Sequence, residues 1–363
     1  MTEQFQSEPV PPAVSRLGRL ARRVQALLRG GSRIDGGPTD VLQTAWLPHG
    51  RLDAVRLPPR RNLPSISVVV PLYNSASFVT RRLASILHQR WPIAELVLLD
   101  DASSDETLEA VARFASLHGL ALDVVSNGTN SGSPWAQWRR SMPLISGDLV
   151  WIAEADDLAH PDFLCALVPR FRSPGLAIAF ANSCSIDEHD RVREPDTRRW
   201  ITGDRRLLDR DFQMSGGEFL ARCLCIQNVL INVSGVLIRR RVLAAVLDRL
   251  EERLAALRTT GDWLVYCECL KCGDIAFTPR VLNACRRHSA SLSYRADPRQ
   301  HFQEVVSVQA QAIRCAGSGE AAVARATEHA SLLARHLALD PDFAASAMRS
   351  AYATALDHAA PGG

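Results

Sequence analysis

The amino-acid sequence predicts an α/β fold with a doubly wound, mostly parallel sheet. The first observation is that short apolar runs rich in β-branched residues alternate with segments whose apolar residues recur at helical spacing. The second is that polar or acidic residues directly follow each of the first four apolar runs. In open parallel sheets, ligands bind beyond the carboxyl ends of the strands, so the second observation also predicts where a functional site lies.

The first four apolar runs are expected to form parallel strands covered on both faces, because such strands are continuously apolar rather than alternating. They are Ile66 to Val70, Leu96 to Leu99, Leu122 to Val125 and Leu149 to Ala153. Pro71 ends the first of them, since proline cannot donate a hydrogen bond to a strand ladder.

Helices are expected between the first three strands. The first has its apolar residues at Val79, Leu83, Ile86 and Leu87, before a break at Pro92. The second has them at Leu108, Val111, Ala112 and Ala115. Strands that alternate with single helices are typical of a doubly wound parallel sheet.

The second half of the chain is less regular. Strands are expected at Leu176 to Ala181 and Ser234 to Ile238, edge strands at Ile275 to Phe277 and Leu282 to Cys285, and a short helix from Gly261. From about Asp297 the chain is alanine-rich and helical. The prediction divides the chain into an N-terminal extension (1–62), an α/β domain (63–293) and a C-terminal helical segment (294–363).

Composition narrows the classes of partner and location. A net charge of +3 over 363 residues is too small to indicate a nucleic-acid-binding protein. Lys271 is the only lysine, so phosphates and carboxylates would be met mainly by arginine, which favours bidentate contacts. The nine cysteines follow no disulfide spacing, and no hydrophobic secretion signal precedes them, so a reducing, cytoplasmic location is expected.

Residues 15–29 of the N-terminal extension predict an amphipathic helix with an arginine-rich face. Two interpretations remain open. The helix could lie on an anionic membrane, which would make the protein peripheral at the inner face of the plasma membrane. It could equally dock on the protein's own core.

An acidic cluster follows the fourth strand, at Glu154, Asp156 and Asp157. Three carboxylates at one strand end repel one another unless a cation or protons neutralise them. Mg²⁺ and Mn²⁺ prefer oxygen ligands and keep positions open for phosphate oxygens. The alternative is that these residues cap the helix beginning near Pro161. Their position directly after a buried strand favours the metal site.

A second polar cluster, Asp100-Asp101, follows the second strand. Ser104, Asp105 and Thr107 have the chemistry of a helix cap, but two further aspartates exceed what one cap needs. A carboxylate at this point could accept a hydrogen bond from a pyrimidine N–H, and Tyr73 after the first strand could face the base.

Together these features resemble the family 2 glycosyltransferases with the GT-A fold, which is Rossmann-like. The resemblance starts with SVVVPLYN (67–74) and LVLLDDASSDET (96–107), and continues with NSGSPWAQW (130–138), SGDLVWIAEADD (146–157), TGDW and RRHSASLS. It covers about residues 64–293. It implies an inverting enzyme that uses a nucleoside-diphosphate sugar and a divalent metal.

The resemblance also implies roles for residues at matching positions. Asp156 and Asp157 occupy the place of the family's metal-binding Asp-x-Asp element, which here reads Glu-Ala-Asp-Asp, so either Glu154 or Asp157 is the closer ligand. His288 matches a histidine that contacts the metal or the diphosphate, and Arg287 beside it could clamp phosphate. The expected donor-binding set is Pro71, Tyr73, Asn74, Asp101, Asp156 and Arg287, together with Asn130 and Gly132. The last two could instead simply connect the third strand to the helix that follows it.

Inversion requires a carboxylate that takes the acceptor's proton on the face opposite the leaving diphosphate. In similar enzymes this residue lies at a helix start late in the domain, and Asp262 in Thr-Gly-Asp-Trp is the best match, with Trp263 available to pack on a sugar face. The alternatives are that Asp262 is a plain N-cap, and that Glu268, about two turns further along, is the base.

The implied reaction moves a sugar from a UDP- or dTDP-linked donor to a hydroxyl of a glycan or lipid-linked glycan, in surface polysaccharide or glycoconjugate synthesis. Two alternatives remain open. A nucleotidyltransferase would usually carry a Gly-rich, basic phosphate loop after the first strand, where this chain reads Tyr73-Asn74-Ser75. A catalytically silent glycan-binding or scaffold protein would not need the whole acidic set together with Asp262.

Overall fold

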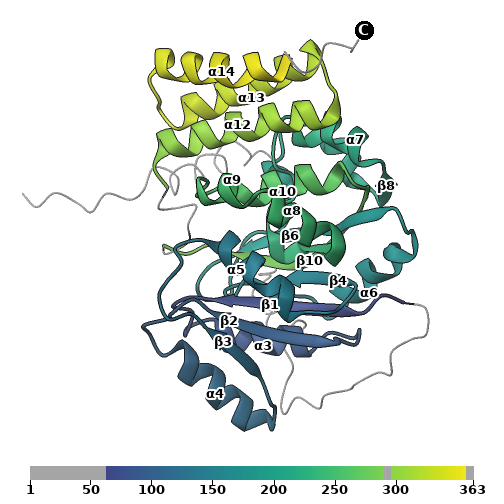
Figure 1. Ribbon diagram of the computed structural model, residues 1–363, viewed down its shortest axis with the longest axis vertical. Coiled ribbons are helices and arrows are strands. Elements are labelled where there is room, and N and C mark those ends of the chain that lie inside the picture. Colours follow the sequence, from purple (N-terminus) through teal and green to yellow (C-terminus); the bar gives the residue numbers. More distant parts are fainter. Residues whose placement is uncertain (1–62, 290, 292–295, 357–363) are drawn as a thin grey trace, which may run out of the picture.

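The structure is a computed structural model that describes residues 63–289, 291 and 296–356 (Figure 1). The basic helix expected at residues 15–29 lies outside the described residues, and the division of the chain into three segments stays a prediction. The described residues confirm the predicted α/β fold class, with helices on both faces of a mostly parallel sheet.

The first half of the sheet is parallel. Its strands are β1 (Ile66–Leu72), β2 (Glu95–Asp100), β3 (Asp123–Ser126) and β4 (Leu149–Ile152). They pair in the order β3-β2-β1-β4, with Leu72 opposite Asp100 and Val69 opposite Ile152. All four therefore end at the same edge of the sheet, which we call the rim.

The second half of the sheet is mixed. Its longest strands are β6 (Leu176–Ile186) and β10 (Asp274–Arg286), which pair in parallel, and β9 (Val236–Arg239) lies antiparallel between β4 and β6. The short strands β5 (Leu158–Ala159), β7 (Val192–Glu194) and β8 (Phe212–Met214) pair antiparallel with β10 or β6.

The prediction of two edge strands at Ile275 to Phe277 and Leu282 to Cys285 was wrong. Both segments belong to the single strand β10, which has neighbours on both sides. The register with β6 shifts between Thr278 and Val281, around Pro279. Proline interrupts the hydrogen-bond ladder there, and in the sequence this interruption resembles the end of a strand.

Helices cover both faces of the parallel half. On one face, α3 (Val79–Leu87) and α4 (Thr107–His118) share a hydrophobic core with Val68 and Val70 of β1. On the other, α5 (Pro134–Ser141), α8 (Arg240–Arg249) and α10 (Gly261–Leu270) share a core with Val69. Because successive residues of a strand point to opposite faces, β1 contributes to both cores.

The C-terminal helices form a separate layer, at the top of Figure 1. They are α12 (Pro298–Ala316), α13 (Glu320–His336) and α14 (Pro341–Leu356). Alanines at every fourth position of α13 are buried, from Ala322 to Ala334, so the helix can approach its neighbours closely. The layer packs on the α/β core through α12, which contacts α10.

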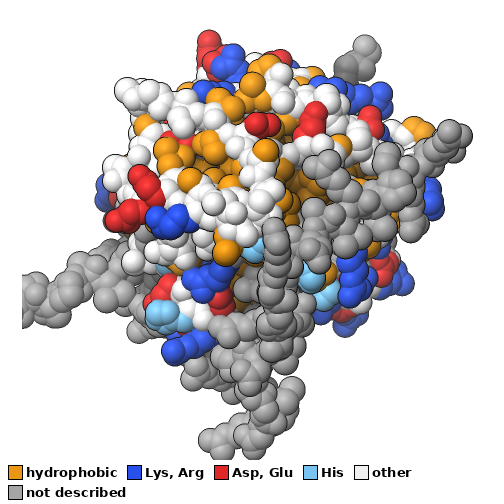
Figure 2. All heavy atoms as spheres, turned by 90° about the horizontal axis from the view of Figure 1, so that it is seen from below, with side chains coloured by type: hydrophobic (Ala, Val, Ile, Leu, Met, Phe, Trp, Pro, Cys, Tyr) orange, Lys and Arg blue, Asp and Glu red, His pale blue; other side chains and the backbone are white. Residues whose placement is uncertain are grey.

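Strand β3 lies at the end of the described sheet and pairs with β2. Figure 2 shows the molecule from the end where α4 lies, and hydrophobic side chains are mixed there with charged ones. β3 has four residues, most of them exposed, and begins with Asp123. A short edge strand with a charged residue is a common protection against edge-to-edge association.

In the described part of the chain, no helix has both the length and the apolar character that crossing a membrane requires.

Candidate active site

The rim brings together polar residues that are far apart in the chain. Tyr73 follows β1, Asp101 follows β2, and Glu154 begins the acidic cluster after β4. Tyr73 is 52% exposed. A tyrosine that packs in a core buries a large apolar area, and Tyr73 does not do so. An exposed aromatic ring beside polar groups is well suited to contact a nucleotide base. Pro71, also predicted for donor binding, is a partly buried residue of β1.

Asn74 joins the ends of β1 and β2. Its backbone is in the left-handed region, with φ 49°, a conformation that asparagine tolerates better than most residues. Its Oδ1 accepts hydrogen bonds from the backbone N–H of Ser104 at 2.8 Å and of Asp105 at 3.3 Å, and its own N–H donates to the Ser103 hydroxyl. Asn74, which we predicted to bind the donor, therefore holds the loop after β2 in this structure.

Asp101 organises the loop after β3. Its carboxylate, 6% exposed, accepts hydrogen bonds from the N–H of Ser131 at 2.9 Å, the Ser131 hydroxyl at 2.7 Å, Gln137 Nε2 at 2.6 Å and the Asn127 amide. Asn130 donates to the Asp101 carbonyl oxygen at 3.1 Å. With φ 64°, Gly132 makes the turn that follows. The predicted donor-binding residues Asp101, Asn130 and Gly132 thus form one network.

The acidic cluster is buried enough to change its ionisation. Burial and the charges of Asp156 and Asp157 raise the pKa of Glu154 to about 8. Burial and the charge of Asp156 raise the pKa of Asp157 to about 6. Near neutral pH the cluster therefore carries fewer than three negative charges, and a divalent cation beside it would favour the ionised forms.

Asp157 faces the interior of the protein. It is 1% exposed, and its Oδ1 accepts a hydrogen bond from the backbone N–H of Arg286 at 2.8 Å. Its Oδ2 is also buried and has no hydrogen-bond partner among the described residues. Asp157 therefore anchors the rim to β10.

A buried cation, not predicted from the sequence, lies close to the acidic cluster. The side chain of Arg82 on α3 is fully buried 5.0 Å from the centre of the Trp151 ring, and its guanidinium nitrogens have no hydrogen-bond partner among the described residues. Burial lowers its pKa to about 10, opposed by the charges of Asp157, Asp156 and Glu154. Arg82 thus offsets part of the cluster's negative charge. An arginine within the apolar stripe of a predicted helix was the available signal.

Among the predicted metal ligands, His288 and Asp156 form the most direct contact. His288 Nε2 lies 2.9 Å from Asp156 Oδ2, and both side chains are partly exposed. The imidazole ring packs against Phe78, with ring centres 5.0 Å apart. The guanidinium of the neighbouring Arg287, predicted to clamp phosphate, stacks over Trp200 at 5.2 Å.

Arg286 supports the acidic cluster from behind and was also missed. Its side chain is fully buried, forms an ion pair with Asp190, and donates to the carbonyl oxygens of Asp156 and Asp187. Its guanidinium carbon lies 4.9 Å from the centre of the Phe78 ring. A single arginine thereby connects the segment after β4 with the segment after β6.

Asp262 lies in the first turn of α10. Its carboxylate accepts hydrogen bonds from the backbone N–H of Trp263 at 2.7 Å and from Asn228 Nδ2 at 3.2 Å. Burial raises its pKa to about 6. One turn later, the buried hydroxyl of Tyr266 has no hydrogen-bond partner among the described residues. Burial raises the pKa of this phenol, and the charges of Asp262 and then of Glu154 raise it further.

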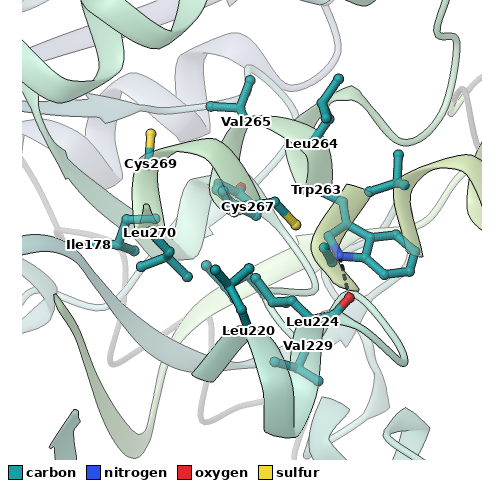
Figure 3. Packing of buried hydrophobic residues seen from close by; sticks show 14 of the residues in the cluster. Ile178, Leu220, Leu224, Val229, Trp263, Leu264, Val265, Cys267, Cys269 and Leu270 are labelled. Atoms are coloured by element: carbon teal, nitrogen blue, oxygen red, sulfur yellow. Dashed lines mark hydrogen bonds between the residues drawn. The ribbon is translucent and has the colours of Figure 1, made fainter. Parts of the chain in front are cut away.

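The other side of α10 is fixed in the hydrophobic core (Figure 3). Trp263 is 3% exposed and donates from Nε1 to the carbonyl oxygen of Leu224 at 3.1 Å, so the expectation that it packs on a sugar was wrong. Cys267 and Cys269 are buried in the same core, and burial raises the pKa of both thiols. A Cβ on Gly261 would approach the Trp135 ring to 2.4 Å, so this position requires glycine.

Glu268, the alternative base, is directed away from the rim. It is buried and contacts Arg249 at 3.1 Å, Lys271 at 3.4 Å and Gln311 of α12 at 2.6 Å. These contacts give its carboxylate a structural role between α10 and α12. Asp262 remains the better candidate.

The described residues contain no group of three or more His, Cys, Asp or Glu side chains arranged to hold a metal ion. The assignment of Glu154, Asp156, Asp157 and His288 as metal ligands therefore stays a prediction. Asp156 and His288 are the pair that the structure brings closest, and Mg²⁺ is commonly held by one or two protein ligands together with substrate phosphates.

Parts of this chain are similar to known glycosyltransferases. TarS of Staphylococcus aureus, a poly(ribitol-phosphate) beta-N-acetylglucosaminyltransferase, is 34% identical over 100 residues, which are 27% of this chain and 17% of TarS. The abequosyltransferase RfbV of Salmonella typhimurium is 27% identical over 180 residues, 48% of this chain and 53% of RfbV. The chain thus spans about half or less of the length of these relatives.

The crystal structure of S. aureus TarS 1–349 in complex with UDP-GlcNAc shares the fold, with a TM-score of 0.52 at 16% identity over 80% of this chain and 92% of that one. The family described as glycosyl transferase family 2 matches residues 67–246, which include the rim segments after β1, β2 and β4 but neither Asp262 nor His288. Through the match over residues 67–246 and the similarity to these relatives, this chain belongs to the family 2 glycosyltransferases.

Proposed function

We propose that this protein is an inverting glycosyltransferase that moves a sugar from a UDP- or dTDP-linked donor to a hydroxyl acceptor. The observation that carries the proposal is the contact between Asp156, after β4, and His288, 132 residues further along the chain, whose Oδ2 and Nε2 atoms lie 2.9 Å apart. At the start of α10, the Asp262 carboxylate is held by Asn228 and by the Trp263 N–H. One end of the site would hold the diphosphate and the other would activate the acceptor.

The donor end is supported by the chemistry of the rim. Tyr73 offers an exposed ring for the base, and the network around Asp101 fixes the loop beside it. The related TarS has been crystallised with UDP-GlcNAc, which supports a nucleotide-sugar donor for this chain as well. Asp156 and His288 would hold Mg²⁺ or Mn²⁺, whose positive charge supplies electrostatic stabilisation of the departing diphosphate.

Asp262 would act as the general base. Its carboxylate would accept the proton of the acceptor hydroxyl as the oxygen attacks the anomeric carbon on the face opposite the diphosphate. The bond to the diphosphate breaks as the new glycosidic bond forms, so the anomeric configuration inverts in one step and no covalent enzyme intermediate forms. The contacts with Asn228 and the Trp263 N–H orient the carboxylate without protonating it.

We further propose that the acceptor is a glycan or lipid-linked glycan in surface polysaccharide or glycoconjugate synthesis. Two relatives whose names describe the transfer of a sugar support this class. They are the abequosyltransferase of Salmonella typhimurium and the TarS enzyme. A peripheral position at the inner face of the plasma membrane, through residues 15–29, stays a prediction that falls outside the described residues.

A donor panel tests the proposed function. The protein is incubated with Mn²⁺ and UDP-N-acetylglucosamine, UDP-glucose, dTDP-glucose or GDP-mannose, with and without a lipid-linked glycan extract, and released nucleoside diphosphate is measured. Acceptor-stimulated release from a UDP or dTDP donor supports the proposal. Binding of all four without release would indicate a silent glycan-binding protein. Pyrophosphate formed from a nucleoside triphosphate and a sugar phosphate would indicate a nucleotidyltransferase.

The rate at saturating donor is expected to fall about tenfold per pH unit below about pH 6. The pKa of Asp262 is raised to about 6, so below that pH the carboxyl is increasingly protonated and cannot take the acceptor's proton. Above it, the rate should be level. Since the pKa of Asp157 is also about 6, UDP binding is measured by calorimetry over the same range. A rate that stays level down to pH 5 would count against Asp262 as the base.

Replacing Asp156 with asparagine is expected to weaken Mn²⁺-dependent UDP binding at least about tenfold, equivalent to about 1.4 kcal/mol. The amide keeps the size of the side chain but removes the charge that a cation would meet beside His288. Asp123→Asn is the matched control, because this exposed aspartate begins β3 at the edge opposite the rim. Calorimetric titrations with and without Mn²⁺ measure the effect, and equal affinities for the two variants would refute the role of Asp156.

A further inference from the structure

The segment between α9 (Glu251–Ala255) and α10 determines where Asp262 lies. It includes residues 257–260 and has no regular secondary structure of its own. Thr260 stands at the N-cap of α10, but its side chain makes no capping hydrogen bond. Since a capping side chain normally fixes the start of a helix, another group must fix this one.

Glu304 of α12 is that group. Its Oε1 accepts a hydrogen bond from the backbone N–H of Arg258 at 2.9 Å. Its Oε2 accepts from the N–H of Thr259 at 2.8 Å, the Thr259 hydroxyl at 2.8 Å and the Thr260 hydroxyl at 3.3 Å. The residue is 5% exposed. A buried carboxylate that accepts several hydrogen bonds from one segment holds that segment more firmly than neutral acceptors would.

Other residues of α12 strengthen this contact. Gln300 Nε2 donates to Glu304 Oε1 at 3.2 Å, and His301 Nδ1 lies 2.8 Å from the Thr259 hydroxyl. In the first two turns of α12, Glu304 and His301 thus contact the segment 257–260, and Gln300 contacts Glu304. Asp297 is the N-cap of this helix, and its side chain accepts from the Gln300 N–H, which fixes the first turn of α12.

The opposite side of the segment contacts α5 and the loop after β3. Trp135 Nε1 donates to the carbonyl oxygen of Leu257 at 3.1 Å, and the Trp135 ring fills the space where Gly261 lacks a side chain. Arg258 Nη1 donates to the carbonyl oxygen of Gly132 at 3.1 Å. The segment is therefore held between α12 on one side and the loop that Asp101 organises on the other.

We infer that Glu304 is a positioning residue for Asp262, so that the C-terminal helices take part in catalysis by fixing the start of α10. The inference rests on the proposed function, because it assigns Asp262 as the base. Glu304 does not touch the substrate. It acts through the N–H groups of Arg258 and Thr259 and the Thr260 hydroxyl, in a segment that ends two residues before the carboxylate. Small displacements of a catalytic group can cost about a hundredfold in rate.

Hydrogen–deuterium exchange tests the contact without any substrate. In Glu304→Gln, the side-chain amide presents a donor where Arg258 or Thr259 also donates, so the peptide covering 257–262 should exchange at least about tenfold faster. Glu320→Gln is the matched control, because Glu320 is an exposed residue in the first turn of α13. It should exchange like the wild type, as should the peptide covering α4 in both variants. Unchanged exchange at 257–262 in Glu304→Gln overturns the inference.

Kinetics then separate positioning from a general loss of folded protein. With the panel donor that the wild type uses fastest, Glu304→Gln should lower kcat about tenfold while the donor KM and UDP affinity stay within about twofold. The fall in rate at low pH, which we call the acid limb, should begin below pH 6 in this variant. A loosened helix start admits water to Asp262 and so relieves the burial that raises the pKa of Asp262. The other titratable groups coupled to this region, Tyr266 and Glu154, are unchanged in the variant. Partial unfolding would lower kcat without moving the limb.

The outcomes are distinguishable. If the wild type releases no nucleoside diphosphate from any panel donor, the proposed function fails and the inference falls with it. If the wild type is active and Glu304→Gln matches Glu320→Gln in kcat and in acid limb, the inference alone is overturned. A lower kcat with an unmoved limb also overturns it, because the effect would then be structural.

Discussion

Replacing Asp262 with asparagine is expected to lower the rate of sugar transfer by about a thousandfold, within the range that a positioned general base contributes. The amide has almost the same volume, so the backbone of α10 should not move. Its oxygen can still accept from Asn228 or from the Trp263 N–H, and only one of these two hydrogen bonds is lost. What the amide cannot do is take the acceptor's proton.

Two measurements make this prediction specific. Calorimetry should give a UDP affinity within about twofold of the wild type, because the proposed function places Asp262 at the acceptor end of the site. Glu268→Gln serves as the matched control and should keep most of the activity, since Glu268 is engaged with Arg249, Lys271 and Gln311. If Glu268→Gln were inactive and Asp262→Asn active, the two roles would have to be exchanged.

Replacing Arg286 with methionine is expected to cost about 3 kcal/mol of folding free energy, the largest stability loss predicted for this protein. Methionine fills much of the same volume but leaves the buried Asp190 carboxylate without its buried partner. The carbonyl oxygens of Asp156 and Asp187 lose their donor as well. Arg81, which lies 2.7 Å from Asp190 and is partly exposed, keeps the loss at the lower end of the range for broken buried pairs.

Urea unfolding of Arg286→Met and Arg287→Met measures this difference between neighbours. Arg287 stacks over Trp200 and is partly exposed, so its replacement should cost less than about 1 kcal/mol. Equal midpoints for the two variants would show that the Arg286 ion pair contributes little to stability. The same comparison separates a buried structural arginine from one placed where it could meet a ligand.

Much of the fold could be predicted from the sequence because its strongest signal is local. Strands β1, β2 and β4 are continuous apolar runs, which occur where both faces of a strand are covered. The polar residues that follow these strands are also a local signal, and they indicated that a functional site lies at the rim. The error at β10 arose where Pro279 interrupts a strand that continues beyond it, since only pairing with β6 reveals that the two parts are one.

The residues that the sequence did not reveal are those whose role depends on distant partners. Arg82 and Arg286 look like surface arginines until the fold buries them beside carboxylates more than seventy residues away. Glu304 lies in an alanine-rich segment without a motif, and its importance comes from the N–H groups of Arg258 and Thr259 that it accepts from. Trp263 shows the opposite error: it was expected to pack on a sugar, but it is buried in the core. An aromatic residue beside a candidate base can belong to either place.

The contact between Arg258 and the Gly132 carbonyl has a consequence for redesign of this protein. If the loop after β3 binds the nucleotide, this hydrogen bond links the donor end of the site to the segment that precedes Asp262. Changes made in that loop to accept another donor would then also shift Asp262. Selectivity and turnover would then change together. Tyr73, whose exposed ring stands at the end of β1, offers a place to alter the choice of nucleotide while leaving that hydrogen bond intact.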